Sequence, residues 1–219
     1  MTKTQQDQIQ LTKTFVKTTL EHAEGGHDWF HTLRVFKNCL LISETESVDH
    51  FIVALGALLH DIADSKFNDG DESVGPQKAR EFLFGINIDS AVIEHVVNII
   101  SHISFKGGNE PQKFQSPELD VIQDADRLDA LGAIGIARTF NYGGFKNRKI
   151  FDPSIQPKLN MTKEEYKAST APTINHFYEK LLLLKDRMNT KTGKKIASNR
   201  HRFMEQFLDQ FYAEWDGEK

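Results

Sequence analysis

The sequence predicts an all-α protein, a helical bundle with a helical extension at its C-terminal end, and three features support this prediction. Apolar residues recur at helical spacing along most of the chain. Residues that typically start or stop helices separate these apolar stretches. No stretch alternates between apolar and polar residues for long enough to indicate a β-strand.

Five helices are expected before residue 110, over about residues 5–22, 29–40, 48–64, 76–86 and 89–104. Asp28 and Asp89 are the expected N-caps of the second and fifth helices, because their carboxylates can accept backbone N–H bonds. The third helix is apolar almost all round, which is typical of a helix in the middle of a fold. The polar, glycine-containing residues 65–75 are expected to form a loop.

Three further helices are expected after residue 115, over about residues 116–137, from 162 to before 193, and from there to 215. Ser116 and Pro117 supply a cap and a first-turn proline for the first of them. Thr162 and Glu165 form a capping-box pattern for the next helix, and Gly193 is expected to separate it from the last one. The two C-terminal helices fit either a lid or a docked extension.

The composition is that of an ordinary globular protein. The 219 residues are 39% hydrophobic and 26% charged, with a formal net charge of -4. This charge does not favour polymeric nucleic acid as a partner, because surfaces that bind it are usually basic. The polar N-terminal residues lack a signal core, and the apolar-rich stretch 51–59 is too short to span a bilayer. We therefore expect a soluble, cytoplasmic protein without a membrane partner, in which the single cysteine, Cys39, is a buried filler.

The apolar third helix leads directly into His60 and Asp61. Burying a carboxylate costs several kcal/mol unless the group is paired or bound to a metal. The two residues can supply one nitrogen ligand and one oxygen ligand from adjacent positions. Taken alone, the pair also fits a core histidine followed by a surface aspartate.

His27 and His31 are four residues apart, so they share a helix face if the second helix includes both. His31 is expected to point inward, and Arg34, one turn further on, could reach a phosphate group. Taken alone, this pattern also fits one core histidine and one surface histidine.

Several acids lie in an otherwise apolar helix near residue 126. Asp124, Asp126 and Asp129 need positive partners there, and Arg127 can pair with Asp124 or Asp129. A metal ion is the natural partner for another carboxylate. Two histidines and two carboxylates together form a mixed N/O ligand set that suits Mn, Fe, Ni, Co or Zn and leaves positions open for water and a phosphate oxygen.

In this order, His31, His60-Asp61 and Asp126 resemble the signature of the HD-domain superfamily of metal-dependent phosphohydrolases. Longer motifs resemble a small bacterial branch similar to nucleotide pyrophosphohydrolases; they cover residues 26–35, 57–67, 123–135 and 176–181, with Arg200. The resemblance implies a single HD-type domain over residues 1–219, with a core of about 20–140 and a C-terminal helical extension of about 160–216.

The resemblance also implies roles for individual residues. The expected metal ligands are His31, His60, Asp61 and Asp126. Related alarmone hydrolases carry two acids shortly after the His-Asp pair; here these positions are Asp64 and Ser65, so a catalytic, water-activating role is carried over to Asp64 alone. The expected substrate-binding residues are His27, Arg34, Lys66 and Arg127. A solvated surface lysine is the alternative for Lys66, a structural ion pair for Arg127, and a contact to a metal ligand for His27.

The activity implied is the hydrolysis of a nucleoside triphosphate to a monophosphate and pyrophosphate. The expected cofactor is a divalent metal ion, manganese first, with Mg, Ni, Co, Fe or Zn as alternatives, and the expected partner is a small nucleotide. Hydrolysis of nucleoside monophosphates, cyclic nucleotides or alarmones is the alternative activity. An HD-type iron oxygenase would need a second metal, for which His102 is the obvious spare ligand, and a non-enzymatic nucleotide sensor would not need the open metal site. The oligomeric state is not predicted.

Residues 142–149 combine aromatic rings with positive charges. This segment could close over the base and phosphates of a nucleotide. A solvated loop is the simpler interpretation, because clusters of charge are common on protein surfaces.

Overall fold

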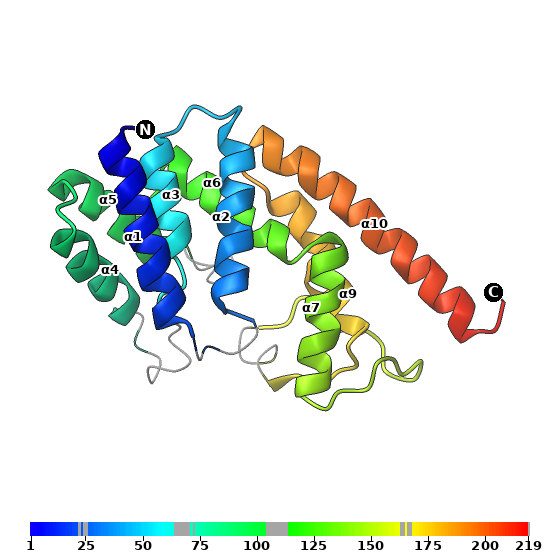
Figure 1. Cartoon of the computed structure of the whole chain (residues 1–219). Coiled ribbons are helices and arrows are strands. Elements are labelled where there is room, and N and C mark those ends of the chain that lie inside the picture. Colours follow the sequence, from blue (N-terminus) through cyan, green and yellow to red (C-terminus); the bar gives the residue numbers. More distant parts are fainter. Residues whose placement is uncertain are drawn as a thin grey trace. The chain divides into compact units, whose positions relative to one another are not determined.

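The computed structural model describes residues 1–21, 23, 26–63, 71, 73–103, 114–162, 165 and 168–218. All regular structure within these residues is helical, which confirms the all-α prediction (Figure 1). The chain divides into two compact units, Met1–Asp126 and Arg127–Lys219. A single domain over the whole chain stays a prediction. Among the described helices, none is long and apolar enough to cross a membrane.

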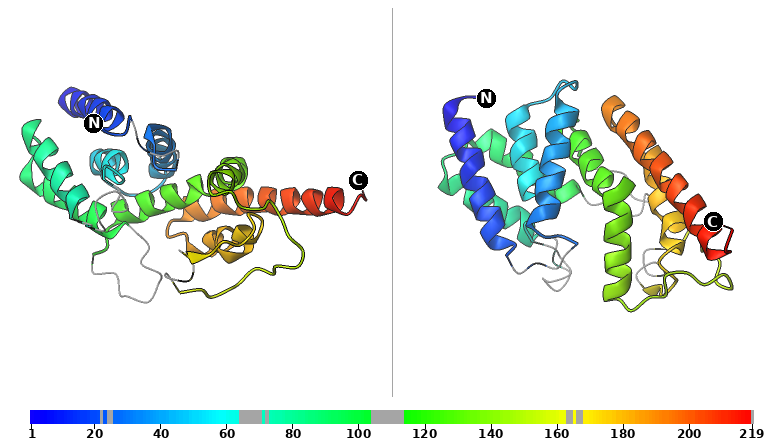
Figure 2. Two further views of the ribbon diagram at one scale, coloured as in Figure 1. Left: turned by 90° about the horizontal axis from the view of Figure 1, so that it is seen from below. Right: turned by 45° about the vertical axis from the view of Figure 1, so that its right-hand side comes forward.

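The first unit is built around one buried helix. Its helices are α1 (Lys3–Thr19), α2 (Trp29–Ser43), α3 (His50–Leu59), α4 (Val74–Gly85), α5 (Ser90–His102) and most of α6 (Pro117–Asp129). Every residue of α3 from Phe51 to Leu59 is buried, and α3 packs against α1, α2 and α5. Figure 2 shows α1, α2 and α3 side by side, and α4 packed against α5. The apolar pattern of the third predicted helix therefore identified the centre of this unit.

Side-chain caps fix where these helices begin. The carboxylate of Asp28 accepts a hydrogen bond from His31 N at 2.8 Å, and that of Asp89 accepts one from Ala91 N at 2.9 Å. Both caps were expected from the sequence. The hydroxyl of Ser116 likewise accepts from the backbone N–H of Leu119 at 3.1 Å, which confirms the predicted start of α6.

The end of α3 differs from the prediction. A helix over residues 48–64 was expected, but α3 ends at Leu59 and residues 60–63 form a turn. The N–H of Ile62 donates to the Leu59 carbonyl at 3.2 Å, a spacing of three residues that closes the turn. Asp61 therefore lies beyond the helix. Asp64, expected one helical turn from His60, lies outside the described residues, as do Ser65 and Lys66.

The second unit has an aromatic core. It contains the end of α6, α7 (Gly132–Phe145), α9 (Asn175–Glu179), the 3-10 helix η2 (Leu181–Arg187) and α10 (Lys191–Trp215). Phe177 is fully buried, and its ring lies 6.1 Å from that of Phe140 and 5.8 Å from that of Phe207, measured between centroids. These contacts join α7, α9 and α10. The last helix ends at Trp215, as predicted.

The sequence joined α6 and the start of α7 into one helix over residues 116–137, and this was wrong. The loop predicted over 141–160 is confirmed from residue 146 onward. The helix α6 ends at Asp129, and α7 continues to Phe145. Gly132 has φ +70°, a left-handed conformation that a helix does not tolerate and that glycine adopts at little cost. The chain therefore changes direction between the two helices.

Two predictions for the C-terminal helices had different outcomes. The capping box is present, because Thr162 N donates to Glu165 Oε2 at 2.9 Å and Glu165 N donates to Thr162 Oγ1 at 3.2 Å. Gly193 does not separate two helices. It lies in the first turn of α10, where its N–H donates to the N-cap hydroxyl of Thr190 at 2.9 Å, so the break precedes Thr190.

Candidate metal centre

The structure brings the four predicted metal ligands together within the first unit. His31 comes from α2, His60 and Asp61 from the turn after α3, and Asp126 from α6. The Nε2 atoms of His31 and His60 are 3.3 Å apart, and Asp61 Oδ2 lies 3.4 Å from each of them. Asp126 Oδ1 lies 3.5 Å from His31 Nε2. Four donor atoms of the expected types therefore converge.

These separations fit a single cation. Nitrogen and oxygen ligands that are about 2.1 Å from an ion lie about 3.0 Å apart in octahedral geometry and about 3.4 Å apart in tetrahedral geometry. Separations of 3.3 to 3.5 Å join His31 to donor atoms of His60, Asp61 and Asp126, and His60 to Asp61. Asp126 also has a ligand atom within 4.8 Å of His31 and His60. Two imidazoles and two carboxylates form a donor set that suits first-row divalent metals. The residues present therefore fit a metal ion of this class.

A backbone contact orients the ring of His60. Its Nδ1 lies 2.9 Å from the carbonyl oxygen of Ala57, which can only accept a hydrogen bond, so we assign the ring proton to Nδ1. In the neutral ring, which is the form that binds a metal, the lone pair on Nε2 is then directed at the cluster. This arrangement, in which one ring nitrogen is held by a carbonyl and the other is presented to a metal, is common among metal-binding histidines.

The carboxylates of the cluster favour positive charge on the groups around them. Burial by itself would lower the pKa of His60, but the carboxylates of Asp61 and then Asp126 outweigh it and raise this pKa to about 9. Burial would raise the pKa of Asp61, but the charge of His60 and hydrogen bonds from His27, His31 and His60 hold this pKa well below its usual value. A buried carboxylate of this kind needs a positive partner.

The site is closed on the imidazole side and open on the carboxylate side. The side chains of His31 and His60 are only 1% and 2% exposed, whereas those of Asp61 and Asp126 are 23% and 43% exposed. Solvent can therefore reach the carboxylates. A cation held here would keep coordination positions available to water or a ligand.

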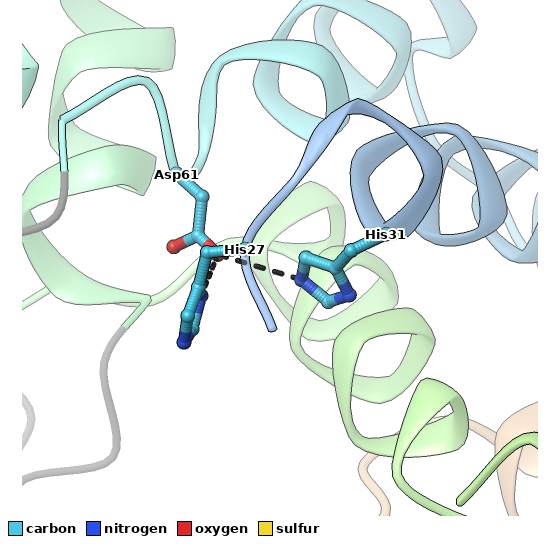
Figure 3. Close-up of side chains that lie close together, drawn as sticks. All are labelled: His27, His31 and Asp61. Carbon is cyan, nitrogen blue, oxygen red and sulfur yellow. Dashed lines mark hydrogen bonds and ion pairs between the residues drawn. The ribbon is translucent and has the colours of Figure 1, made fainter. Parts of the chain in front are cut away.

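His27 lies beside this cluster but not on the helix that carries His31. Because α2 begins at Trp29, after the predicted cap Asp28, the condition for His27 and His31 to share a helix face is not met. Figure 3 shows the ring of His27 against the Asp61 carboxylate, with Nδ1 2.6 Å from Oδ2. His27, His31 and Asp61 also form a group whose ligand atoms lie close enough together to hold a metal. The contact of His27 with a predicted ligand was one of the two roles expected for it.

The other predicted residues have varied positions. Arg34 lies on α2 one turn beyond His31 and is half-buried. Arg127 Nη1 donates to the carbonyl of Arg187 at 2.6 Å, while the carboxylate of Asp129 pairs with Arg138 at 2.7 Å. Substrate binding by His27, Arg34, Lys66 and Arg127 stays a prediction. In the described part of the chain, the groups that could hold a metal do not include His102, whose Nδ1 lies 2.8 Å from the carbonyl oxygen of Asn98.

One supporting residue was missed. Asn38 Nδ2 donates to the carbonyl of Ala125 at 3.3 Å and thereby ties α2 to α6 next to Asp126. Asn38 is seven residues after His31, two turns along the same helix face. A polar residue two helical turns after a proposed ligand, on the same face, could have identified Asn38 as a supporting residue.

We expect Asp28→Ala to lower the free energy of unfolding by about 1 kcal/mol, because it removes the cap of α2. Since the capped N–H belongs to His31, the substitution should also weaken metal binding. Urea denaturation and metal titration measure the two effects. Asp7→Ala removes an exposed carboxylate on α1 and is the matched control; equal stability of both variants would contradict the role of the cap.

The helical fold and the His/Asp cluster define a class of all-α proteins with a candidate divalent-metal site. The HD domain family model matches residues 29–131, a range that includes all four predicted ligands. Bacillus subtilis YpgQ is 37% identical to this protein over 212 residues, which cover 96% of this chain and 95% of YpgQ. The chain therefore belongs to the HD domain superfamily.

Solved structures agree with this assignment. The crystal structure of an HD-superfamily hydrolase from Bacillus thuringiensis matches with a TM-score of 0.78 and 44% identity, over 97% of this chain and 98% of that one. The structure of YpgQ in complex with ADP matches with a TM-score of 0.77 and 33% identity in the structural alignment, over 96% of each chain. Both alignments cover nearly the whole length, so the likeness extends beyond the residues of the candidate site.

Proposed function

We propose that this protein is a divalent-metal-dependent nucleotide phosphohydrolase that converts a nucleoside triphosphate into a monophosphate and pyrophosphate, with manganese as its metal. The observation that carries the proposal is the cluster around His31 Nε2, which has one imidazole nitrogen and two carboxylate oxygens, from His60, Asp61 and Asp126, at 3.3 to 3.5 Å. The structure of YpgQ with ADP supports a nucleotide as the substrate, because YpgQ resembles this chain over 96% of its length.

His31, His60, Asp61 and Asp126 would hold the metal. When bound, such an ion lowers the pKa of a water molecule and polarises a phosphoryl oxygen. The chain prepares this chemistry by holding the ligands in place: the Ala57 carbonyl orients His60, and His27 supports the carboxylate of Asp61. Ligands held in this way lose little orientational freedom when a cation binds.

The remaining proposed roles concern the substrate. With Nδ1 directed at Asp61, His27 presents its other ring edge on the half-exposed side of the site, where we propose that it contacts the substrate. We propose that Asp64 orients or deprotonates the attacking water. Arg34, Lys66 and Arg127 are proposed to neutralise phosphate charge.

A nucleotide panel with product identification tests this function. The protein is stripped with EDTA, reloaded with manganese, and incubated with nucleoside tri-, di- and monophosphates, cyclic nucleotides and alarmones. We expect equimolar monophosphate and pyrophosphate from triphosphates, and no product without metal. Release of orthophosphate, a linear monophosphate from a cyclic nucleotide, or oxygen uptake with iron would each identify one of the alternative activities instead.

A further inference from the structure

A cavity of about 410 Å³ is lined only by residues of the second unit, and none of the candidate metal ligands is among its lining residues. Its polar lining includes the side chains of Lys146, Asn147, Arg148, Lys149, Ser169 and Thr170. The first four of these residues belong to the segment 142–149, for which the sequence allowed either a solvated loop or a cover over a nucleotide. Residues 142–145 form the last turn of α7, and the cations that follow line a cavity.

Backbone contacts fix the walls of this cavity. Arg148 Nη2 donates to the carbonyl of Ser169 at 2.6 Å, which joins its two sides. The N–H of Thr173 donates to the Lys149 carbonyl at 2.9 Å, so the chain on either side of the cavity is tied together. Gly143 allows this close approach, because a Cβ at that position would lie only 2.2 Å from Thr173 Oγ1. The positive groups are therefore held on a fixed frame.

The charge of the cavity is strongly one-sided. Three cationic residues line it, and none of the described residues in its lining is acidic. Asp152 lies outside the lining and pairs with Lys149 at 2.8 Å, which offsets one of the three charges. Burial, and after it the charges of Lys180 and Arg148, lower the pKa of His176 to about 3, so this ring adds no charge of its own.

We propose that this cavity binds a phosphate-bearing anion with the size and charge of a di- or triphosphate group. A guanidinium, two ammonium groups, an amide and two hydroxyls are the groups that usually bind phosphate oxygens in proteins. The volume lies in the range of small-molecule sites. An adjoining cavity of about 390 Å³ shares Ile155, Ala168, Ser169 and Thr170 with the first. Its lining includes Glu165 and Glu179, so it provides room for the uncharged, organic part of a phosphorylated ligand and not for the phosphates.

Pyrophosphate binding, measured by calorimetry in EDTA, tests the proposal without any metal. The double variant Lys146→Gln/Lys149→Gln removes two exposed charges of the cavity, and Lys194→Gln/Lys195→Gln removes two exposed charges on α10 as the matched control. We expect the cavity variant to bind at least about tenfold more weakly, since two charge-assisted hydrogen bonds are lost. The control should bind like the wild type.

Two results would overturn the proposal. Equal pyrophosphate affinity of the wild type and the cavity variant would show that the cations serve another purpose, such as stabilising the C-terminal end of α7, which thermal unfolding of the same variant would reveal. An equal loss of pyrophosphate affinity in the Lys194→Gln/Lys195→Gln control would show that the anion is attracted nonspecifically by the charge of the protein. Arg148→Lys keeps the positive charge of the side chain but loses the bidentate donor geometry of the guanidinium. We therefore expect its pyrophosphate affinity to lie between that of the wild type and that of the double lysine variant.

The source of the phosphate is distinguished in a second measurement. If the site binds the phosphates of the enzyme's own substrate, Lys146→Gln/Lys149→Gln will raise the KM of nucleotide hydrolysis by the factor by which it weakens pyrophosphate binding. If the site binds a separate phosphorylated ligand, KM will not change while pyrophosphate binding is still lost. Because the first measurement is made without metal, its failure is distinguishable from failure of the proposed hydrolase activity.

Discussion

Asp61→Ala is expected to abolish metal binding and hydrolysis together. Asp61 Oδ2 lies 3.4 Å from both buried imidazole nitrogens, and it is also the acceptor for His27 at 2.6 Å. Removing this carboxylate takes away one proposed ligand and the anchor of His27. The metal content of the purified variant, measured by elemental analysis, should fall to background, and no nucleotide should be hydrolysed when manganese is restored.

Two comparisons separate the loss of a ligand from the loss of the fold. Asp7→Ala makes the same chemical change at an exposed position of α1 and should retain full metal content and activity. Asp61→Asn keeps the shape of the side chain but removes its charge, and it should also lose the metal while its circular dichroism stays helical. Normal turnover by either Asp61 variant would refute the proposed metal centre.

Gly135→Ala is expected to destabilise the second unit severely. A Cβ at Gly135 would lie 2.2 Å from the carbonyl oxygen of Ala130 and 2.4 Å from its carbon. These are backbone atoms in the turn between α6 and α7, where Arg200 Nη1 also donates to the Leu128 carbonyl at 2.5 Å. Because neither side can move easily, we expect the free energy of unfolding to fall by about 3 kcal/mol or more. Thermal and urea unfolding followed by circular dichroism measure this loss.

Gly144 provides a control in the same helix. A Cβ there would have no atom within 4 Å, apart from its own local backbone. Gly144→Ala should leave stability unchanged or raise it by up to about 1 kcal/mol, because alanine favours helix more than glycine does. If both alanine variants were equally stable, the close approach of Gly135 to Ala130 would not constrain the fold.

Local physical chemistry made much of the fold predictable from the sequence. The caps Asp28, Asp89 and Ser116 act within their own helix ends, so residue type and position were enough to predict them. The central place of α3 followed from its apolar residues on every side. The four proposed ligands were named from the resemblance to the HD-domain signature, because residue type and spacing alone left a structural alternative open for each of them.

The points where the sequence failed depend on contacts between distant residues. The apolar pattern over residues 48–64 did not reveal that α3 ends at Leu59. The turn that follows Leu59 brings Asp61 into contact with His27, which is 34 residues earlier in the chain. The break between α6 and α7 depends on the left-handed Gly132, with Arg200 packed against it. An apolar repeat continues through such a break, so periodicity alone does not detect it.

The sequence by itself determined an all-α chain, the starts of α2, α5 and α6, and the residue types available to hold a cation. These properties depend on side-chain chemistry within one or two helical turns. Only the tertiary structure decided that donor atoms of three other residues lie 3.3 to 3.5 Å from His31 Nε2, and that Lys146, Arg148 and Lys149 line a cavity. Those facts depend on distances between residues far apart in the chain, which packing and turn geometry set and local propensity does not.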